Sequence, residues 1–194
     1  MHKYLPNLFI FLDQYNNQIF KNNNTNIGVI YRNYNNPKRE IELIKISKAC
    51  KRNRYQLFVS NDIKLTIKVK ADGIYIPSFN KTKKFLNLEN KNLIILGSAH
   101  NQKEIQEKIS QKCKAIFLSP IFDINKNKSK SFLDIHKFNF LSRKNKINFL
   151  ALGGISEDNI RKLRLLNIKG VGGIRLFKKK PAFKRPVFLK NKFF

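Results

Sequence analysis

The sequence predicts an α/β fold, and within that class a small (β/α)8 TIM barrel, from two observations. Eight short apolar runs are spread along the 194 residues, and they are nearly continuously apolar, as is typical of parallel strands buried on both faces. Several of these runs are separated by segments with helical periodicity, which gives the strand–helix–strand alternation of parallel sheets. An open doubly wound sheet is the alternative that the same alternation allows.

The predicted strands are short and rich in Ile, Leu, Val and Phe, the composition that strands favour. In chain order they cover residues 8–12, 27–31, 55–59, 73–76, 93–96, 115–118, 147–152 and 170–177.

Three segments between the strands carry helix signals. Residues 39–50 place Ile41, Ile44 and Ala49 near one apolar stripe, with charged residues elsewhere. Asn101 precedes a segment with acidic residues in its early turns, which is how helices prefer to begin. A third helix is predicted to begin at Ser156, a capping residue followed by two acids.

The chain is slightly shorter than the roughly 200 residues from which TIM barrels usually start, so some helices must be short or missing. Residues 61–70 and 81–92 are the brief connections where this shortening is expected. No internal repeat or Gly/Ser-rich linker divides the sequence, so residues 1–194 are predicted to form one domain, with 178–194 as an irregular basic tail.

The charge of the chain is strongly positive. Lys and Arg number 40 against 12 Asp and Glu, which gives a formal net charge of +28 and a pI near 10.3. Such a charge excludes a neutral, self-associating surface and points to nucleic acid, an anionic membrane or phosphorylated ligands as partners. Heavy use of Lys, Ile, Asn and Phe, which have A/T-rich codons, is an alternative origin of the charge that needs no partner.

The two cysteines, Cys50 and Cys113, lie far apart and lack the spacing of a zinc site. They are predicted to be reduced, buried thiols, as in cytosolic proteins. No apolar run approaches the roughly 18 residues of a membrane span, and no secretory signal is recognised. The protein is therefore expected to be cytoplasmic.

The loops that follow the strands of a TIM barrel build its active site. These positions combine carboxylates, amides, hydroxyls, arginines and glycines, which suits a phosphorylated ligand with a metal better than acyl transfer. They are Asp13, Arg32, Asn61, Asp62, Ser78, Asn80, Ser98, His100, Ser119, Asp123, Gly153, Gly154 and Arg175.

Gly153 and Gly154 are the most informative of these positions. A strand that ends in two glycines before a helix presents backbone N–H groups and the positive end of a helix dipole to an anion. The pair follows the seventh predicted strand, where TIM barrels commonly bind phosphate. A tight turn that needs small residues is the structural alternative.

Six motifs in register resemble the thiamine phosphate synthase and TenI family of small (β/α)8 barrels, over nearly the whole chain up to Phe177. The motifs are Leu8 to Asp13, Ser60-Asn61-Asp62, Ala71-Asp72-Gly73-Ile74, Leu96-Gly97-Ser98-Ala99-His100, Ser119-Pro120-Ile121-Phe122 and Ala151-Leu152-Gly153-Gly154-Ile155.

This resemblance implies a transferase that joins an aminopyrimidine pyrophosphate to a thiazole phosphate, releasing pyrophosphate and forming thiamine phosphate. It implies that Arg32 and Asn61 contact the pyrophosphate, with Lys128 (or Lys126) as a further basic residue. It also implies Mg²⁺, with Asp62 as one ligand and Asn80 at the position of the second, where the family has Asp.

The same resemblance assigns the thiazole phosphate to Gly153 and Gly154, with Ser98 and Arg175 as further substrate-binding residues. Arg175 stands where the family has Ser. Tyr34 stands at the Lys of the family's Arg-x-Lys pair.

Two alternatives remain open at this point. One is a TenI-type protein that binds or isomerises thiazole phosphate, although no His lies in residues 123–131, where such proteins carry one. The other is a non-catalytic basic barrel that binds RNA through residues 178–194, where Phe and basic residues interleave. Phosphorylated small molecules are the favoured partners, and the tail can instead pack its Phe side chains against the barrel.

Overall fold

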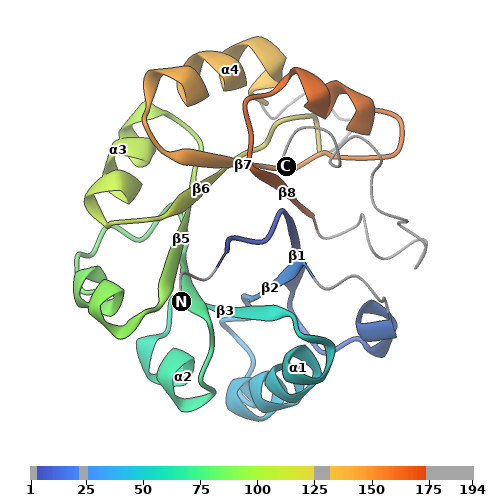
Figure 1. Cartoon of the computed structure of the whole chain (residues 1–194), viewed down its shortest axis with the longest axis vertical. Helices are drawn as coiled ribbons and strands as arrows, with labels where there is room; N and C mark the ends of the chain where they lie inside the picture. The colour runs from blue at the N-terminus through green and yellow to red at the C-terminus, as the bar shows by residue number, and fades with distance from the viewer. Residues whose placement is uncertain (1–3, 22–25, 125–131, 174–194) are drawn as a thin grey trace.

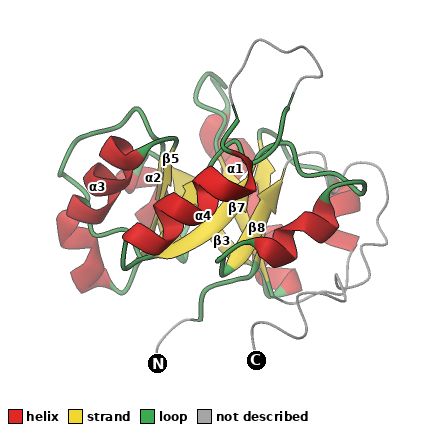
Figure 2. Ribbon diagram, turned by 90° about the horizontal axis from the view of Figure 1, so that it is seen from above, coloured by secondary structure: helices red, strands yellow, loops and turns green. Residues whose placement is uncertain are grey.

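Eight parallel strands close into a barrel, in which each strand pairs with its neighbours in chain order and β8 pairs with β1. The computed structural model describes residues 4–21, 26–124 and 132–173. Helices surround the ring of strands in the view along the barrel and in the view from its side (Figures 1 and 2). The predicted (β/α)8 barrel is confirmed, and the open sheet is excluded.

The strand boundaries follow the apolar runs closely. The strands are β1 (Leu8–Leu12), β2 (Ile27–Tyr31), β3 (Gln56–Ser60), β4 (Gly73–Ile76), β5 (Ile94–Ala99), β6 (Ala115–Leu118), β7 (Asn148–Leu152) and β8 (Gly170–Gly173). β5 continues three residues past the predicted end, because Gly97 pairs with β4 and β6, and Ser98 and Ala99 continue the ladder with β6. The predicted residues 174–177 of the last strand lie outside the described residues.

The connections are short helices, as the length of the chain required. The α-helices are α1 (Arg39–Asn53), α2 (Ile63–Lys68), α3 (Gln102–Ser110) and α4 (Asp134–Lys144), and the 3-10 helices are η1 (Asn17–Lys21), η2 (Leu86–Lys91) and η3 (Ile160–Leu165). The predicted cap of α3 is confirmed, because Asn101 Oδ1 accepts a hydrogen bond from the Glu104 N–H at 3.0 Å.

Two details of the helix prediction were wrong. In α1 the buried stripe is formed by residues such as Leu43, Ile46 and Cys50, whose spacing of three and four places them on the inner face. Ile41 and Ile44 lie on the outer side and are 56% and 37% exposed, whereas Ala49, the third residue of the predicted stripe, is buried. The helix predicted from Ser156 is a short 3-10 helix that begins only at Ile160.

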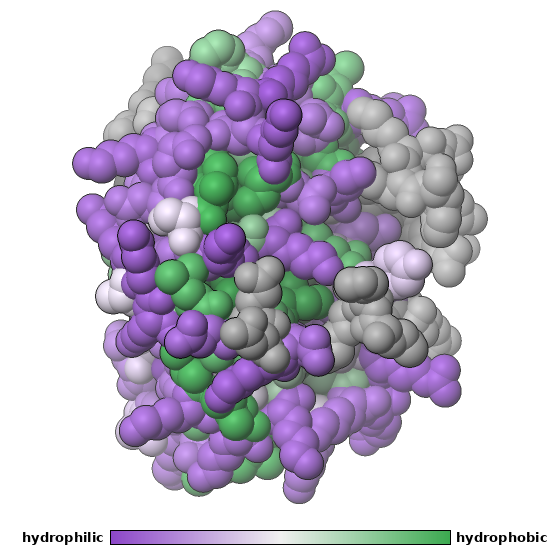
Figure 3. All heavy atoms as spheres, turned by 60° about the vertical axis from the view of Figure 1, so that its left-hand side comes forward, coloured by the Kyte–Doolittle hydropathy of each residue, from purple (hydrophilic) through white to green (hydrophobic). Residues whose placement is uncertain are grey.

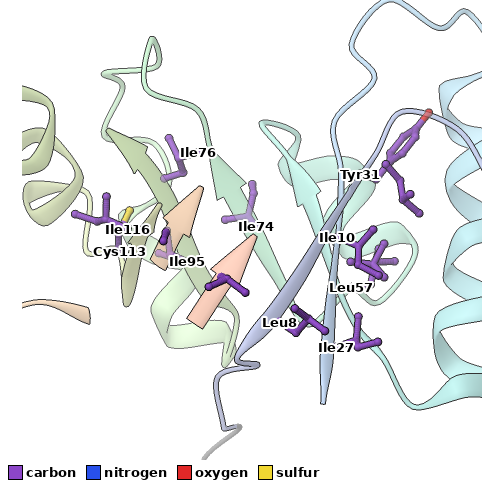
Figure 4. Close-up of a cluster of buried hydrophobic side chains, with 14 of the residues drawn as sticks. Leu8, Ile10, Ile27, Tyr31, Leu57, Ile74, Ile76, Ile95, Cys113 and Ile116 are labelled. Carbon is purple, nitrogen blue, oxygen red and sulfur yellow. The ribbon is translucent and has the colours of Figure 1, made fainter. Parts of the chain in front are cut away.

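The alternation of side chains along each strand builds two apolar layers. One layer lies between the strands and the helices and is mainly aliphatic; Figure 4 shows part of it, including Leu8, Ile10 and Ile74. Its cysteines, Cys50 and Cys113, are buried and free, as predicted, and burial raises the pKa of the Cys113 thiol to about 12.

The other layer fills the lumen of the barrel and is largely aromatic. The ring of Phe9 lies 5.1 Å from that of Phe117 and 5.8 Å from that of Phe58, centroid to centroid. Gly28 provides space for these rings, since a Cβ at this position would lie 2.5 Å from the Phe9 ring. The lumen is therefore a packed core, and a ligand has access only to its ends.

Hydrophilic side chains dominate the face drawn in Figure 3, with small hydrophobic areas between them. None of the helices in the described ranges is long and apolar enough to cross a membrane.

We expect Phe117→Ala to lower the free energy of unfolding by about 3–5 kcal/mol, because it removes a fully buried ring from the lumen and leaves a cavity. Urea denaturation followed by circular dichroism measures the change. Phe140→Ala, at a ring that is 66% exposed, is the matched control and should stay within about 0.5 kcal/mol of the parent chain. Equal effects of the two substitutions would contradict a packed aromatic lumen.

Candidate functional site

All eight strands run parallel, so the residues that follow them meet at one end of the barrel. We call this end the mouth and define it by the residues that directly follow β1, β2, β3, β4, β5 and β7. Five of the predicted site residues, Arg32, Asn61, Asp62, Gly153 and Gly154, lie directly after a strand at this end. Ser98 lies within β5, one residue before its last residue. Lys128 and Arg175 lie outside the described residues.

Arg32 is fixed at the mouth by three contacts. Its backbone N–H donates to the Leu12 carbonyl at 3.0 Å, and its Nε donates to Asp13 Oδ1 at 3.1 Å. Its guanidinium carbon lies 5.6 Å from the centroid of the Phe11 ring, at the top of the lumen. With 36% of its side chain exposed, Arg32 presents a positioned positive charge to solvent at the mouth.

Arg39, the first residue of α1, places a second guanidinium beside the ends of β2 and β3. Its Nη2 donates to the Ser60 carbonyl at 2.6 Å, and its Nη1 lies 3.6 Å from Asp62 Oδ2. The guanidinium carbon also lies 5.5 Å from the centroid of the Tyr34 ring. Sequence reasoning missed Arg39; the available signal was that the predicted first helix begins only a few residues after the second strand.

Asn61 and Asn80 are brought together from the loops after β3 and β4. Asn61 has a φ of +59°, a left-handed conformation that Asn tolerates better than most residues. Its N–H donates to the Tyr75 carbonyl at 2.9 Å, and its Oδ1 accepts a hydrogen bond from Asn80 Nδ2. Asn80 itself is buried, and its Oδ1 accepts the N–H of Thr82 at 2.9 Å.

Asp62 acts as the N-cap of α2. Its Oδ1 accepts the N–H of Leu65 at 2.9 Å, while its Oδ2 faces Arg39. The capping role explains why an acid directly precedes this short helix.

The predicted magnesium ligands, Asp62 and Asn80, do not fit that ion as they are placed. Mg²⁺ requires a nearly octahedral set of oxygen ligands, usually including one or two carboxylates. The carboxylate of Asp62 is shared between a helix cap and an arginine, and the amide of Asn80 is bonded on both of its polar atoms. Within the described ranges, no three His, Cys, Asp or Glu side chains gather in a way that could hold a metal.

Aromatic side chains and hydroxyls complete this side of the mouth. The hydroxyl of Tyr34 lies 2.5 Å from Ser60 Oγ, and its ring meets the exposed ring of Phe79 edge to face, 6.2 Å between centroids. Below them, Tyr75 shares a side-chain hydrogen bond with Ser98, and burial raises the pKa of Tyr75 to about 12. Tyr75 is therefore a neutral hydroxyl at physiological pH.

Gly153 and Gly154 lie on the β6–β7 side of the mouth. Their φ values of +91° and +71° belong to the left-handed region that favours glycine. A Cβ on Gly154 would lie 2.2 Å from the Phe122 carbonyl oxygen, because the loops after β6 and β7 pack directly on each other. The N–H of Ser156 donates to Asn159 Oδ1 at 2.9 Å, so that N–H is already paired. The tight turn is present, and phosphate binding by these glycines stays a prediction.

Among the histidines, His100 follows β5 at the mouth, with its Nδ1 2.6 Å from the Ser119 carbonyl oxygen. This contact agrees with a structural role for the side chain. His136 lies in the first turn of α4.

Comparison with known structures supports the fold. A thiamine phosphate pyrophosphorylase from Pyrococcus furiosus superimposes with a TM-score of 0.72 at 19% identity, covering 88% of this chain and 85% of that one. A 3-keto-L-gulonate-6-phosphate decarboxylase from Vibrio cholerae superimposes with a TM-score of 0.68 at 12% identity, covering 96% of both chains.

Comparison with curated sequences finds thiamine-phosphate synthases. The enzyme of Prochlorococcus marinus strain SARG is 28% identical over 137 residues, which are 69% of this chain and 39% of the relative. That of Dictyoglomus turgidum is 30% identical over 146 residues, 72% of this chain and 64% of the relative. The chain spans between 35% and 39% of the length of three Prochlorococcus relatives.

The family profile described as thiamine monophosphate synthase (TMP-TENI) matches residues 23–177, from the loop before β2 to beyond β8. This match covers most of the barrel and includes Arg32, Asn61, Asp62, Asn80, Ser98, Gly153 and Gly154. The chain belongs to the thiamine monophosphate synthase (TMP-TENI) family.

Proposed function

We propose that this chain is a transferase that condenses an aminopyrimidine pyrophosphate with a thiazole phosphate to give thiamine phosphate and pyrophosphate. The observation that carries the proposal is the fixed guanidinium of Arg32 at the mouth of a barrel of this family. A positioned cation beside an aromatic, water-poor lumen is suited to stabilise a departing pyrophosphate.

In the proposed reaction the bond between the methylene carbon of the pyrimidine and the pyrophosphate oxygen breaks first. The electron pair leaves with the pyrophosphate, where Arg32 and the Nδ2 donor of Asn61 stabilise the developing negative charge. The thiazole nitrogen then donates its electron pair to the resulting carbocation, which forms the carbon–nitrogen bond of thiamine phosphate.

The remaining residues bind and orient the two substrates. The exposed rings of Tyr34 and Phe79 offer a surface on which a planar pyrimidine can stack. Ser98, held by Tyr75, lies below them and can donate a hydrogen bond to the bound ring. Gly153 and Gly154 would receive the thiazole phosphate, with Arg175 as a proposed further substrate contact. Lys128 is proposed as a further basic contact to the pyrophosphate; both Arg175 and Lys128 lie outside the described residues.

Mg²⁺ is part of what the family resemblance implies, and when bound it would neutralise charge on the leaving pyrophosphate. No step of the proposed reaction depends on it, because the side chains expected to hold it are committed to other contacts. The reaction is proposed to take place in the cytoplasm, in keeping with two buried, unpaired thiols. Nucleic-acid binding by residues 178–194 stays a prediction that is not favoured.

Incubation of the purified chain with both phosphorylated substrates, with and without Mg²⁺, should yield thiamine phosphate detectable by chromatography. We expect Arg32→Ala to lower kcat/KM by about 10²–10³-fold, because the leaving group loses a charged donor. Arg52→Ala, at an exposed arginine of α1, is the matched control and should retain the parent rate. Absence of product at high protein concentration would overturn the proposal; retained binding of thiazole phosphate would then favour the TenI-type alternative.

Gly154→Ala should lower the free energy of unfolding by about 1–3 kcal/mol, because the residue combines a positive φ with a close approach to the Phe122 carbonyl. Thermal denaturation measures the loss. Glu157→Ala, at an exposed position of the same loop, serves as the control and should have little effect. A Gly154→Ala chain as stable as the parent would show that the two loops do not pack as described.

A further inference from the structure

The oxygen atoms at the predicted metal position already have partners within the chain. Asp62 uses Oδ1 to cap α2 and Oδ2 to face Arg39. Asn61 Oδ1 accepts a hydrogen bond from Asn80 Nδ2, and Asn80 Oδ1 accepts one from the Thr82 N–H. A metal ion would have to displace or share each of these bonds.

The backbone carbonyl oxygen of Asn80 also accepts two hydrogen bonds, one from a side chain of α3 and one from the side chain of its C-cap residue. Lys108 Nζ donates to this carbonyl at 2.6 Å, and Gln111 Nε2 donates to it at 3.0 Å. Gln111 Nε2 also donates to the Thr82 carbonyl at 2.8 Å, so the loop after β4 is held at two points. The loop is thus fixed from outside the barrel in the conformation that turns the Asn80 side chain toward Asn61.

Lys108 is an unusual residue for this task, because its side chain is completely buried. Gly97 on β5 provides the space: a Cβ there would lie 2.9 Å from Lys108 Cδ. α3 lies beside β5 on the outside of the barrel (Figure 1), which places the lysine stem between them. A buried amine whose donors are directed at the Asn80 loop does not leave that loop free to adapt to a metal ion.

Arg39 stands beside Asp62 where a divalent cation would otherwise be expected. Its side chain is 17% exposed, and its guanidinium is held by the Ser60 carbonyl and lies near the Tyr34 ring. An arginine in this position neutralises the carboxylate, so the carboxylate does not repel an anion in the mouth. Arg32 directly follows the neighbouring strand β2 and is more exposed than Arg39, so it remains available to contact the anion itself.

From these contacts we infer that the part of the mouth formed by the loops after β2, β3 and β4 binds pyrophosphate with the chain's own fixed cations and without a resident divalent metal ion. Arg32 is the direct contact. Arg39 is a positioning residue that neutralises Asp62, and Lys108 with Gln111 holds the Asn80 loop. The inference rests on the proposed function only for the identity of the anion.

Isothermal titration of the full chain with inorganic pyrophosphate in the presence of EDTA tests this inference. We expect saturable binding without metal, weakened about tenfold by Arg32→Gln and about tenfold by Arg39→Gln, each of which removes one charge. Arg52→Gln is the matched control and should bind like the parent chain. Binding that appears only after Mg²⁺ is added would overturn the inference.

The role of Arg39 is separated from a loss of folding by a double substitution. If Arg39 acts by neutralising Asp62, Asp62→Asn alone should tighten pyrophosphate binding about threefold in EDTA, and Asp62→Asn should restore most of the binding lost in Arg39→Gln. Asn is as good a helix cap as Asp, so α2 should keep its start. Weaker binding in Asp62→Asn would overturn the inference, because removal of a carboxylate that only pairs with Arg39 should not weaken the binding of an anion.

A titration with Mn²⁺ alone, followed by electron paramagnetic resonance, gives a readout independent of pyrophosphate. The parent chain and Asp62→Asn should bind Mn²⁺ equally, and a selective loss in Asp62→Asn would contradict the inference. Failure of the proposed function would give a different result, because the chain would then bind pyrophosphate but form no thiamine phosphate.

Discussion

Closure of the barrel between β1 and β8 is the constraint on which the arrangement of the mouth depends. Leu8 pairs with Val171, and this pairing leaves the described sheet without an edge. The aromatic side chains in the lumen set how closely the strands can approach the barrel axis, and glycines opposite them provide the necessary space. The loops after the strands therefore start from fixed points on a ring, and residues distant in sequence, such as Asp13 and Arg32 or Asn61 and Asn80, meet without any long-range loop of their own.

The electrostatics of the mouth depend more on the pairing of individual charges than on the net charge of the chain. Although the chain carries +28, the described cations that shape the site are the two arginines that each face one carboxylate. Arg32 and Asp13 form a solvent-exposed pair, whereas Arg39 and Asp62 are half-buried beside Tyr34. Because screening by water weakens the first pair more than the second, Arg32 is the more available to a ligand and Arg39 the more fixed.

The sequence was sufficient to predict the barrel because its strands are marked by composition alone. Runs such as residues 27–31 and 115–118 are apolar on both faces, and only a parallel sheet covered on both sides, closed or open, buries both. The strand-end positions followed from the barrel topology. The contacts among these positions could not be predicted. The inner face of α1 could not be predicted either, because the choice between Ile44 and Leu43 depends on the rotation of the helix about its own axis, which the sequence pattern leaves open. Likewise, a lysine in a charged helical segment such as residues 101–109 gives no sign that it is buried unless the missing Cβ of Gly97 on the facing strand is also known.

The contact between Gly97 and Lys108 has a consequence for how this barrel can change over evolution. A methyl group at position 97 would lie 2.8 Å from Cys113 Sγ and 2.9 Å from Lys108 Cδ, so it collides with the lysine stem wherever the lysine is retained. The lysine, and with it the hold on the loop after β4, is therefore difficult to reacquire once lost, since its return requires the glycine as well. A related barrel that keeps Lys108 should therefore also keep Gly97, whereas Gly97 can persist without the lysine.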